Sequence, residues 1–102
     1  MNTTTLTINS STDMDNNSVN TYGFFFIDAS GGNISLDLPI TGINYGSYYE
    51  FVRTDSSVNT VTLNTKTGYT IGGSASLTLG ISQYLYLINN GTDWFVVRFN
   101  RV

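Results

Sequence analysis

The stretch YLYLINNGTDWFVV (Tyr84–Val97) contains the strongest fold signal in this chain. Both of its ends are rich in the aromatic and branched aliphatic residues that favour β-strands. Asn90 and Gly91 between them suit a type I′ turn, because both residues tolerate a positive φ angle. The stretch therefore predicts a β-hairpin, with one strand at Tyr84–Ile88 and the other at Trp94–Val97.

Further strands are indicated elsewhere by residues that alternate between apolar and polar. This alternation occurs at Thr5–Ile8, Ile34–Leu38, Val61–Leu63 and Leu77–Leu79, and no window has the apolar period of a helix. The segments between the strands are rich in turn-forming residues, namely Ser30–Asn33, Asp55–Ser57 and Gly72-Gly73. We expect Ser30–Asn33 to close a second hairpin, between Phe24–Ile27 and Ile34–Leu38.

The spacing of these signals indicates about eight or nine short strands in one all-β domain. We expect an antiparallel, jelly-roll-like β-sandwich at residues 21–102, preceded at residues 1–20 by a first strand and a polar attachment segment. Within that segment, Asn9–Asn20 reads as a loop in which Met14 is the one bulky apolar residue. No internal repeat of solenoid period is visible.

Composition excludes several classes of function. The chain of 102 residues has no Cys and no His, which removes the usual zinc, haem and iron–sulfur ligands, thiol nucleophiles and His-based triads. Four basic residues and a net charge of −3 argue against nucleic-acid binding. The longest apolar run, Gly23–Ile27, is too short for membrane insertion, and the residues after Met1 do not resemble a signal peptide.

The acidic residues are best explained as structural. They are Asp13, Asp15, Asp28, Asp37, Glu50, Asp55 and Asp93. Most lie in or beside predicted turns, where Asp bonds its own backbone, so we expect no catalytic residues. Asp13–Asn17 could hold calcium, but it lacks the Gly and closing Glu of an EF-hand and reads as a polar loop. We therefore expect no metal and no cofactor.

The aromatic residues divide between core and surface. Trp94 is either a core residue or a sugar-stacking platform, and its apolar neighbours favour the core. Alternation places Phe24 and Phe26 on one face of their strand and Phe25 and Ile27 on the other. We expect subunit contacts from one set of aromatic residues, Phe24, Phe26, Tyr84 and Tyr86, and ligand contacts from Tyr45 and Tyr69.

Most of the chain resembles a β-sandwich module of phage and viral tail and head fibres and of capsid-surface proteins. The resembling pieces are Leu38-Pro39, Tyr49–Asp55, Asn59–Leu63, Gly68–Gly73, Leu77–Leu79, Tyr84–Ile88 and Asn90–Val96. The resemblance implies a module that is often trimeric, is placed on fibres or capsids, sometimes touches a host glycan and has no catalytic motif. The chain departs from a typical fibre because it has no shaft.

The resulting expectation is a non-enzymatic structural protein of the virion, assembled in the host cytoplasm as a fibre-head or capsid-decoration module. Its partners would be copies of itself, in a homotrimer, and other capsid or fibre proteins. The alternative is a lectin-like module that binds host-surface carbohydrate through loop tyrosines. A third hypothesis, a small glycan hydrolase, would require a pair of carboxylates facing one another across a cleft.

Overall fold

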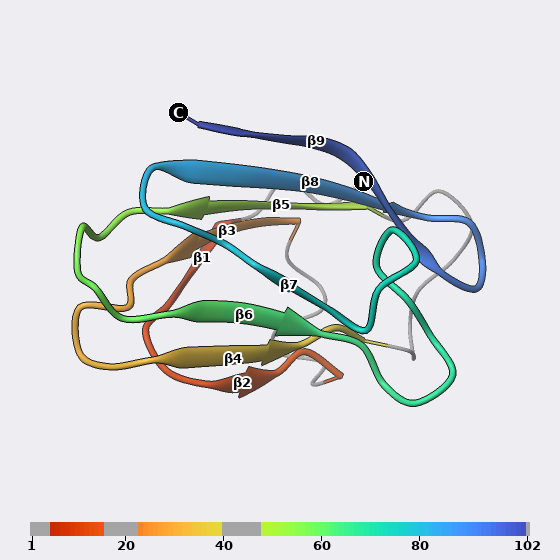
Figure 1. The fold of residues 1–102 in the computed structure, drawn as a ribbon, viewed down its shortest axis with the longest axis horizontal. Helices are drawn as coiled ribbons and strands as arrows, with labels where there is room; N and C mark the ends of the chain where they lie inside the picture. Colours follow the sequence, from red (N-terminus) through yellow and green to blue (C-terminus); the bar gives the residue numbers. More distant parts are fainter. Residues whose placement is uncertain (1–4, 16–22, 40–47, 102) are drawn as a thin grey trace.

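The computed structural model describes residues 5–15, 23–39 and 48–101 (Figure 1), which contain nine strands and no helix. The strands are β1 (Thr5–Ile8), β2 (Thr12–Asp13), β3 (Phe24–Ile27), β4 (Ile34–Asp37), β5 (Tyr48–Arg53), β6 (Val61–Asn64), β7 (Ser76–Thr78), β8 (Gln83–Asn89) and β9 (Trp94–Arg101). The prediction of an all-β domain of eight or nine short strands is confirmed.

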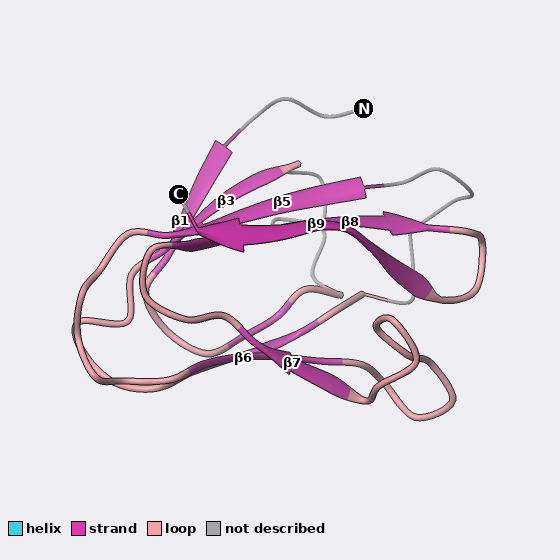
Figure 2. Ribbon diagram, turned by 45° about the horizontal axis from the view of Figure 1, so that its top comes forward, coloured by secondary structure: helices cyan, strands magenta, loops and turns pink. Residues whose placement is uncertain are grey.

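The strands form two sheets. Sheet A has the order β1-β3-β5-β8-β9, and sheet B has the order β2-β4-β6-β7. Figure 2 shows them as two layers, with β6 and β7 facing the strands of sheet A. Buried apolar side chains from both sheets form one core between the layers.

The direction of the strands differs from the prediction. From β1 to β6 the chain alternates between the two sheets, so β1, β3 and β5 pair in parallel in sheet A, and β2, β4 and β6 do so in sheet B. Antiparallel pairs occur only later, at β5·β8, β6·β7 and β8·β9 among the described strands. The expectation of an antiparallel, jelly-roll-like sandwich is therefore wrong for the first six strands.

The segment Ser30–Asn33 accounts for part of this difference. It does not close a hairpin, because β3 lies in sheet A and β4 lies in sheet B. Stacked sheets are about 10 Å apart, and the six residues from Asp28 to Asn33 are enough to cross that distance. Gly, Ser and Asn suit a crossing between sheets as well as a tight hairpin, so local turn chemistry did not distinguish the two.

The hairpin predicted from Tyr84–Val97 is confirmed. β8 and β9 are antiparallel neighbours, and Gly91 between them has a φ of 98°. The expected type I′ turn is wrong, because it needs a positive φ at both central residues and Asn90 has none. The Asn90 side-chain oxygen accepts hydrogen bonds from the backbone N–H groups of Thr92 and Asp93. The residue types in the turn therefore supply both the positive φ angle and the acceptor that this turn needs.

The core is built from the inward-facing residues of both sheets. Phe25, Phe51 and Leu85 are fully buried on neighbouring strands of sheet A, and Leu36 and Leu63 are fully buried on sheet B. The rings of Phe25 and Phe51 stack with centroids 5.2 Å apart. Trp94 is 1% exposed, which confirms its predicted place in the core.

The predicted loop Asn9–Asn20 is partly strand. Thr12 and Asp13 form β2, and Met14 is fully buried, with its backbone N–H bonded to the Asp37 carbonyl at 2.9 Å. Lys66 Nζ lies 2.9 Å from an Asp13 carboxylate oxygen and 3.2 Å from one of Asp15. This part of the chain is thus joined to sheet B, and an attachment role for residues 1–20 stays a prediction.

Candidate functional site

Two groups of side chains stand out from the core, and the first is a buried polar cluster around Arg53. This residue is 5% exposed and follows Ile8 and Ile27 in the same position on successive strands of sheet A. Its guanidinium lies beside Asp55, with Nε 3.1 Å from the carboxylate. It also donates hydrogen bonds to the carbonyls of Leu79, Ser57 and Asn59.

Asp55 completes this cluster from the corner that joins β5 to β6. Its carboxylate accepts hydrogen bonds from the backbone N–H groups of Ala29 and Ser57, at 2.9 and 3.1 Å, and from the Ser57 hydroxyl. The Arg53 guanidinium, followed by these donors, holds the pKa of Asp55 well below its ordinary value. The carboxylate is therefore charged at neutral pH and fully engaged.

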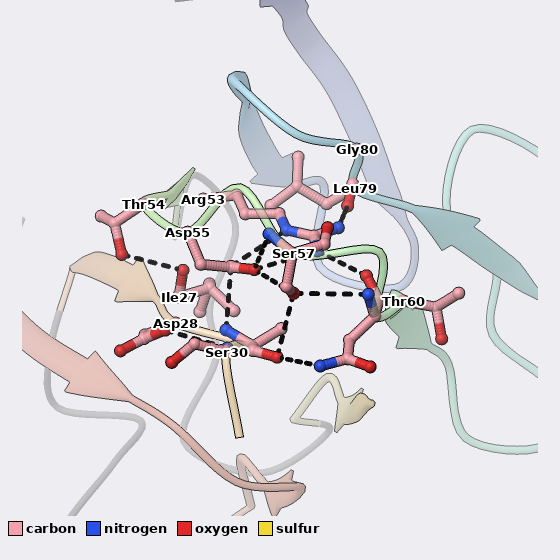
Figure 3. Close-up of polar contacts among 12 residues, drawn as sticks. Ile27, Asp28, Ser30, Arg53, Thr54, Asp55, Ser57, Thr60, Leu79 and Gly80 are labelled. Carbon is pink, nitrogen blue, oxygen red and sulfur yellow. Dashed lines mark hydrogen bonds and ion pairs between the residues drawn. The ribbon is translucent and has the colours of Figure 1, made fainter. Parts of the chain in front are cut away.

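The Arg53 cluster links three connections of the fold: β3 to β4 through Ala29, β5 to β6, and β7 to β8 through Leu79. Figure 3 shows Arg53, Asp55 and Ser57 close together, with Leu79 beside them. Each donor and acceptor in the cluster bonds to another group of the chain itself. The cluster therefore has the chemistry of a structural clamp, which positions the corners between the sheets. Sequence reasoning assigned Asp55 to a turn and missed its partner, which lies two residues earlier.

The second group lies on the side of sheet A that faces away from sheet B, here called the outer face. It comprises Phe24 and Phe26 on β3, Tyr48, Glu50 and Val52 on β5, Tyr84, Tyr86 and Ile88 on β8, and Phe95 on β9. The predicted alternation in β3 is confirmed, since Phe25 and Ile27 are fully buried whereas Phe26 is 37% exposed. The rings of Phe24 and Phe26 are 5.1 Å apart.

Tyrosines occupy the middle of the outer face. The rings of Tyr48 and Tyr86 stack with centroids 5.0 Å apart, and Tyr86 is paired with Glu50 on the neighbouring strand. Burial is the main cause that raises the pKa of Tyr86. A hydrogen bond with Tyr48 and, more weakly, the nearby charge of Glu50 raise it further. The outer face is thus apolar and aromatic, with one carboxylate near its centre.

Exposed apolar residues of the edge strand β9 lie on both sides of sheet A, since Phe95 is paired with Ile88 on the outer face, whereas Val96 and Phe99 are paired with the buried Leu87 and Leu85. Phe95, Val96, Val97 and Phe99 are between 38% and 55% exposed. The backbone N–H of Trp94 donates a hydrogen bond to the Thr70 carbonyl, and the Trp94 carbonyl accepts one from the N–H of Gly72. Further along β9, a register shift interrupts its pairing with β8. Such irregularities limit further strand pairing along an edge, so the broad outer face is the better surface for an interaction.

The structure brings four of the predicted site residues onto one surface, since Phe24, Phe26, Tyr84 and Tyr86 share the outer face. Tyr69 lies elsewhere, half-buried in the loop between β6 and β7, where its carbonyl accepts a hydrogen bond from the Thr65 hydroxyl. Tyr45 lies outside the described residues. Tyr48 and Glu50 were not among the expected site residues. Alternation places them on one face of β5, and the pairing of β5 with β8 brings that face beside Tyr86.

The acidic residues in the described ranges lie mostly apart. Asp13 and Asp15 are paired with Lys66, and Asp55 is paired with Arg53. Asp28 accepts a hydrogen bond from Ser30, and Asp93 accepts one from Thr70. Within residues 5–15, 23–39 and 48–101, no group of three or more acidic residues is placed to hold a metal ion, and no helix could cross a bilayer.

No protein-family model matches the chain, and no curated protein matches it.

Proposed function

We propose that the chain is a non-enzymatic structural module of a virion surface, a fibre head or capsid decoration, which associates with other subunits through the outer face of sheet A. One observation carries this proposal: both faces of sheet A are apolar. A sheet with one face on the core and one in water alternates apolar and polar residues. Here Phe24, Phe26 and Tyr86 occupy outer positions instead.

The chemistry of the face supports association with a protein. Tyrosine and phenylalanine are enriched in interface centres, and charged residues are depleted there. On β1, next to Phe24 and Phe26, the outward residues Thr5 and Thr7 are exposed and polar, as in an interface rim. The resemblance implies a homotrimer, with capsid or fibre proteins as further partners and the virion as the location.

The experiment is to measure the mass in solution by light scattering over a wide concentration range. Phe26→Ser and Tyr86→Ser each remove an apolar group from the outer face, and we expect both to weaken association. Val58→Ser is the matched control, because Val58 is 96% exposed in the corner between β5 and β6. A wild-type protein that stays monomeric at every concentration would sink the self-association part of the proposal.

A second candidate function, lectin-like binding of host carbohydrate, is favoured by the aromatic character of the outer face. Flat apolar rings suit the faces of pyranose sugars, but Tyr48 and Tyr86 stack on each other and so cover part of their own faces. Glycan-array binding by the wild type that is lost in Tyr48→Ala, with the solution mass unchanged, would favour binding at the outer face, and loss in Tyr69→Ala or Tyr45→Ala would favour binding by the loop tyrosines first expected. Binding to no glycan would remove it.

A further inference from the structure

The β8–β9 turn contains the one asparagine of the chain that is followed by glycine, Asn90-Gly91. An asparagine before a glycine is chemically labile, because glycine has no side chain to hinder attack by its own backbone nitrogen. Both residues are exposed, so that water and hydroxide reach them. The turn therefore places a labile asparagine within reach of the reactants that convert it.

The reaction open to this pair is deamidation through a cyclic imide. The Gly91 backbone nitrogen loses its proton to hydroxide and attacks Cγ of the Asn90 side chain, which forms a new carbon–nitrogen bond. The bond from Cγ to Nδ2 then breaks, and the amide nitrogen takes a proton from water and leaves as ammonia. Water opens the imide at one of its two carbonyls and yields aspartate or isoaspartate at position 90. One water is consumed and one ammonia is released, with no oxidant or reductant.

The structure engages both reacting groups in other contacts. The Gly91 N–H donates a hydrogen bond to the Asn89 side-chain oxygen at 2.6 Å. The Asn90 side-chain oxygen accepts hydrogen bonds from the backbone N–H groups of Thr92 and Asp93, at 3.0 and 2.9 Å. The nitrogen that must attack is thus held through its own proton, and the carboxamide that must receive it is held against the following residues.

Asn89 occupies a core position that an apolar side chain could fill. It is 1% exposed, and its Nδ2 has no hydrogen-bond partner among the residues that the structure describes. Burial of an unpartnered amide group is costly. The side-chain oxygen of the same amide bonds to the Gly91 N–H. A role for that oxygen would therefore explain an asparagine at this buried position.

We propose that Asn90 is a site of spontaneous deamidation, and that Asn89 restrains the reaction by holding the Gly91 N–H. Asn89 is a positioning residue, because it acts on the attacking nitrogen and takes no part in the bonds that form and break. Isoaspartate would lengthen the main chain between β8 and β9, whose register depends on the length of the turn. The restraint therefore protects the hairpin, and it acts independently of the outer face of sheet A.

Peptide mass spectrometry during incubation in mildly alkaline buffer tests the site. Each conversion replaces an NH₂ group by OH, and chromatography separates the isoaspartate and aspartate forms. We expect Asn90 to convert before the other asparagines in the urea-unfolded chain, and much more slowly in the folded protein. Asn90→Ser should remove this conversion. Earlier conversion at another asparagine would overturn the site, and equal rates in the folded and unfolded chains would overturn the restraint.

Substitution of Asn89 tests which contact restrains the reaction. In Asn89→Ala the Gly91 N–H loses its acceptor, and Asn90 of the folded protein should convert about fivefold faster, the factor to which one typical hydrogen bond corresponds. Asn89→Asp retains an acceptor oxygen and should convert at nearly the wild-type rate. Asn59→Ala is the matched control, because the Asn59 amide donates to the Ala29 carbonyl at 2.7 Å in a different connection of the fold.

The control separates a local restraint from general stability. A wild-type rate in Asn89→Ala, or a rise of equal size in Asn59→Ala, would overturn the role of Asn89. Thermal unfolding checks that each variant is folded. If Asn89→Ala does not fold, hydrogen exchange of the Gly91 amide in the wild type, measured by NMR, decides the question. Slow exchange supports the bond to Asn89, and exchange at the rate of an unstructured glycine overturns it.

Discussion

Arg53 shows at the scale of one residue how a charged side chain can occupy a core position. The equivalent residues on the two preceding strands of sheet A, Ile8 and Ile27, contribute apolar surface to the core. Arg53 instead offers five N–H donors, and Asp55 and three carbonyls accept from it. Burial of this charge is tolerated because it is paired and its donors are satisfied.

The first prediction concerns Asp55→Asn. This change leaves the Arg53 guanidinium buried without an opposing charge, and we expect the free energy of unfolding to fall by about 3 kcal/mol. Urea denaturation at pH 7 measures the loss. Asp28→Asn is the matched control in the neighbouring corner, because the Asp28 carboxylate accepts a hydrogen bond from the backbone N–H of Ser30 at 3.0 Å and forms no ion pair with Arg53. Equal losses in the two variants would contradict a special role for the Arg53 cluster.

The second prediction is the pH dependence of the same pair. Because the pKa of Asp55 is lowered in the folded protein, its contribution to stability is complete above the pKa of an unfolded Asp, about 3.9. That contribution is lost as the pH falls from there towards the folded pKa. The difference in unfolding free energy between wild type and Asp55→Asn should therefore shrink below about pH 4. A difference that stays constant down to pH 2 would argue against the pairing.

The third prediction concerns Tyr49. Burial, and then the nearby charge of Asp15, raise the pKa of Tyr49 to about 12. The folded protein thus favours the neutral form of the Tyr49 phenol. The contribution of this neutral phenol to the free energy of unfolding is complete below about pH 10, and it is lost as the pH rises through the folded pKa. Phenolate absorbance should show one tyrosine that ionises late, and Tyr49→Phe should remove it. An unchanged titration curve in that variant would contradict the assignment.

At the scale of the element, the turns decide how strands are connected. Gly91 lies in the β8–β9 turn with a φ of 98°, whereas Gly31, in the crossing from β3 to β4, has no positive φ in the left-handed range. A Cβ atom at Gly31 would meet nothing within 4 Å. The β8–β9 turn therefore requires glycine at position 91, whereas the crossing does not require it at position 31.

The fourth prediction follows from that contrast. Gly91→Ala forces a side chain into a strained backbone conformation and should lower the unfolding free energy by roughly 1 kcal/mol. Gly31→Ala is the matched control and should leave stability unchanged or slightly raised, because it reduces the freedom of the unfolded chain. Thermal or urea unfolding measures both. A larger loss in Gly31→Ala than in Gly91→Ala would contradict the turn geometry.

At the scale of the whole molecule, association through the second apolar face of sheet A would add to the stability of a small domain. A domain of 102 residues has a moderate core and therefore a modest margin of stability. Association through the outer face of sheet A would bury Phe26 and Tyr86 and add to that margin by mass action. The proposed self-association therefore has a consequence for stability as well as for assembly.

The fifth prediction is that the unfolding temperature rises with protein concentration. If the folded state associates, a hundredfold increase in concentration should raise the unfolding temperature by several degrees, on the order of 5 °C. Differential scanning fluorimetry at a series of concentrations measures the change. Phe26→Ser should weaken this dependence, and a wild-type unfolding temperature that is independent of concentration would count against association of the folded state.

Much of the local structure was predictable from residue types. Alternation correctly divided Phe24–Ile27 into an inner and an outer face, and Asn90-Gly91 correctly identified a hairpin. The candidate surface was partly predictable for the same reason, because Phe24, Phe26, Tyr84 and Tyr86 all lie on it. The Arg53–Asp55 pair was not, since its donors and acceptors come from three connections far apart in sequence.

The sequence by itself determined most of the strands, β2 excepted, and which side of each of them is apolar. These properties depend on the φ and ψ preferences of neighbouring residues and on a side-chain period of two. Only the tertiary structure decided which strands are neighbours, and that the first six wind in parallel between two sheets. Hydrogen bonds between strands join backbone groups that are alike in every residue, so a strand's own sequence does not name its partner.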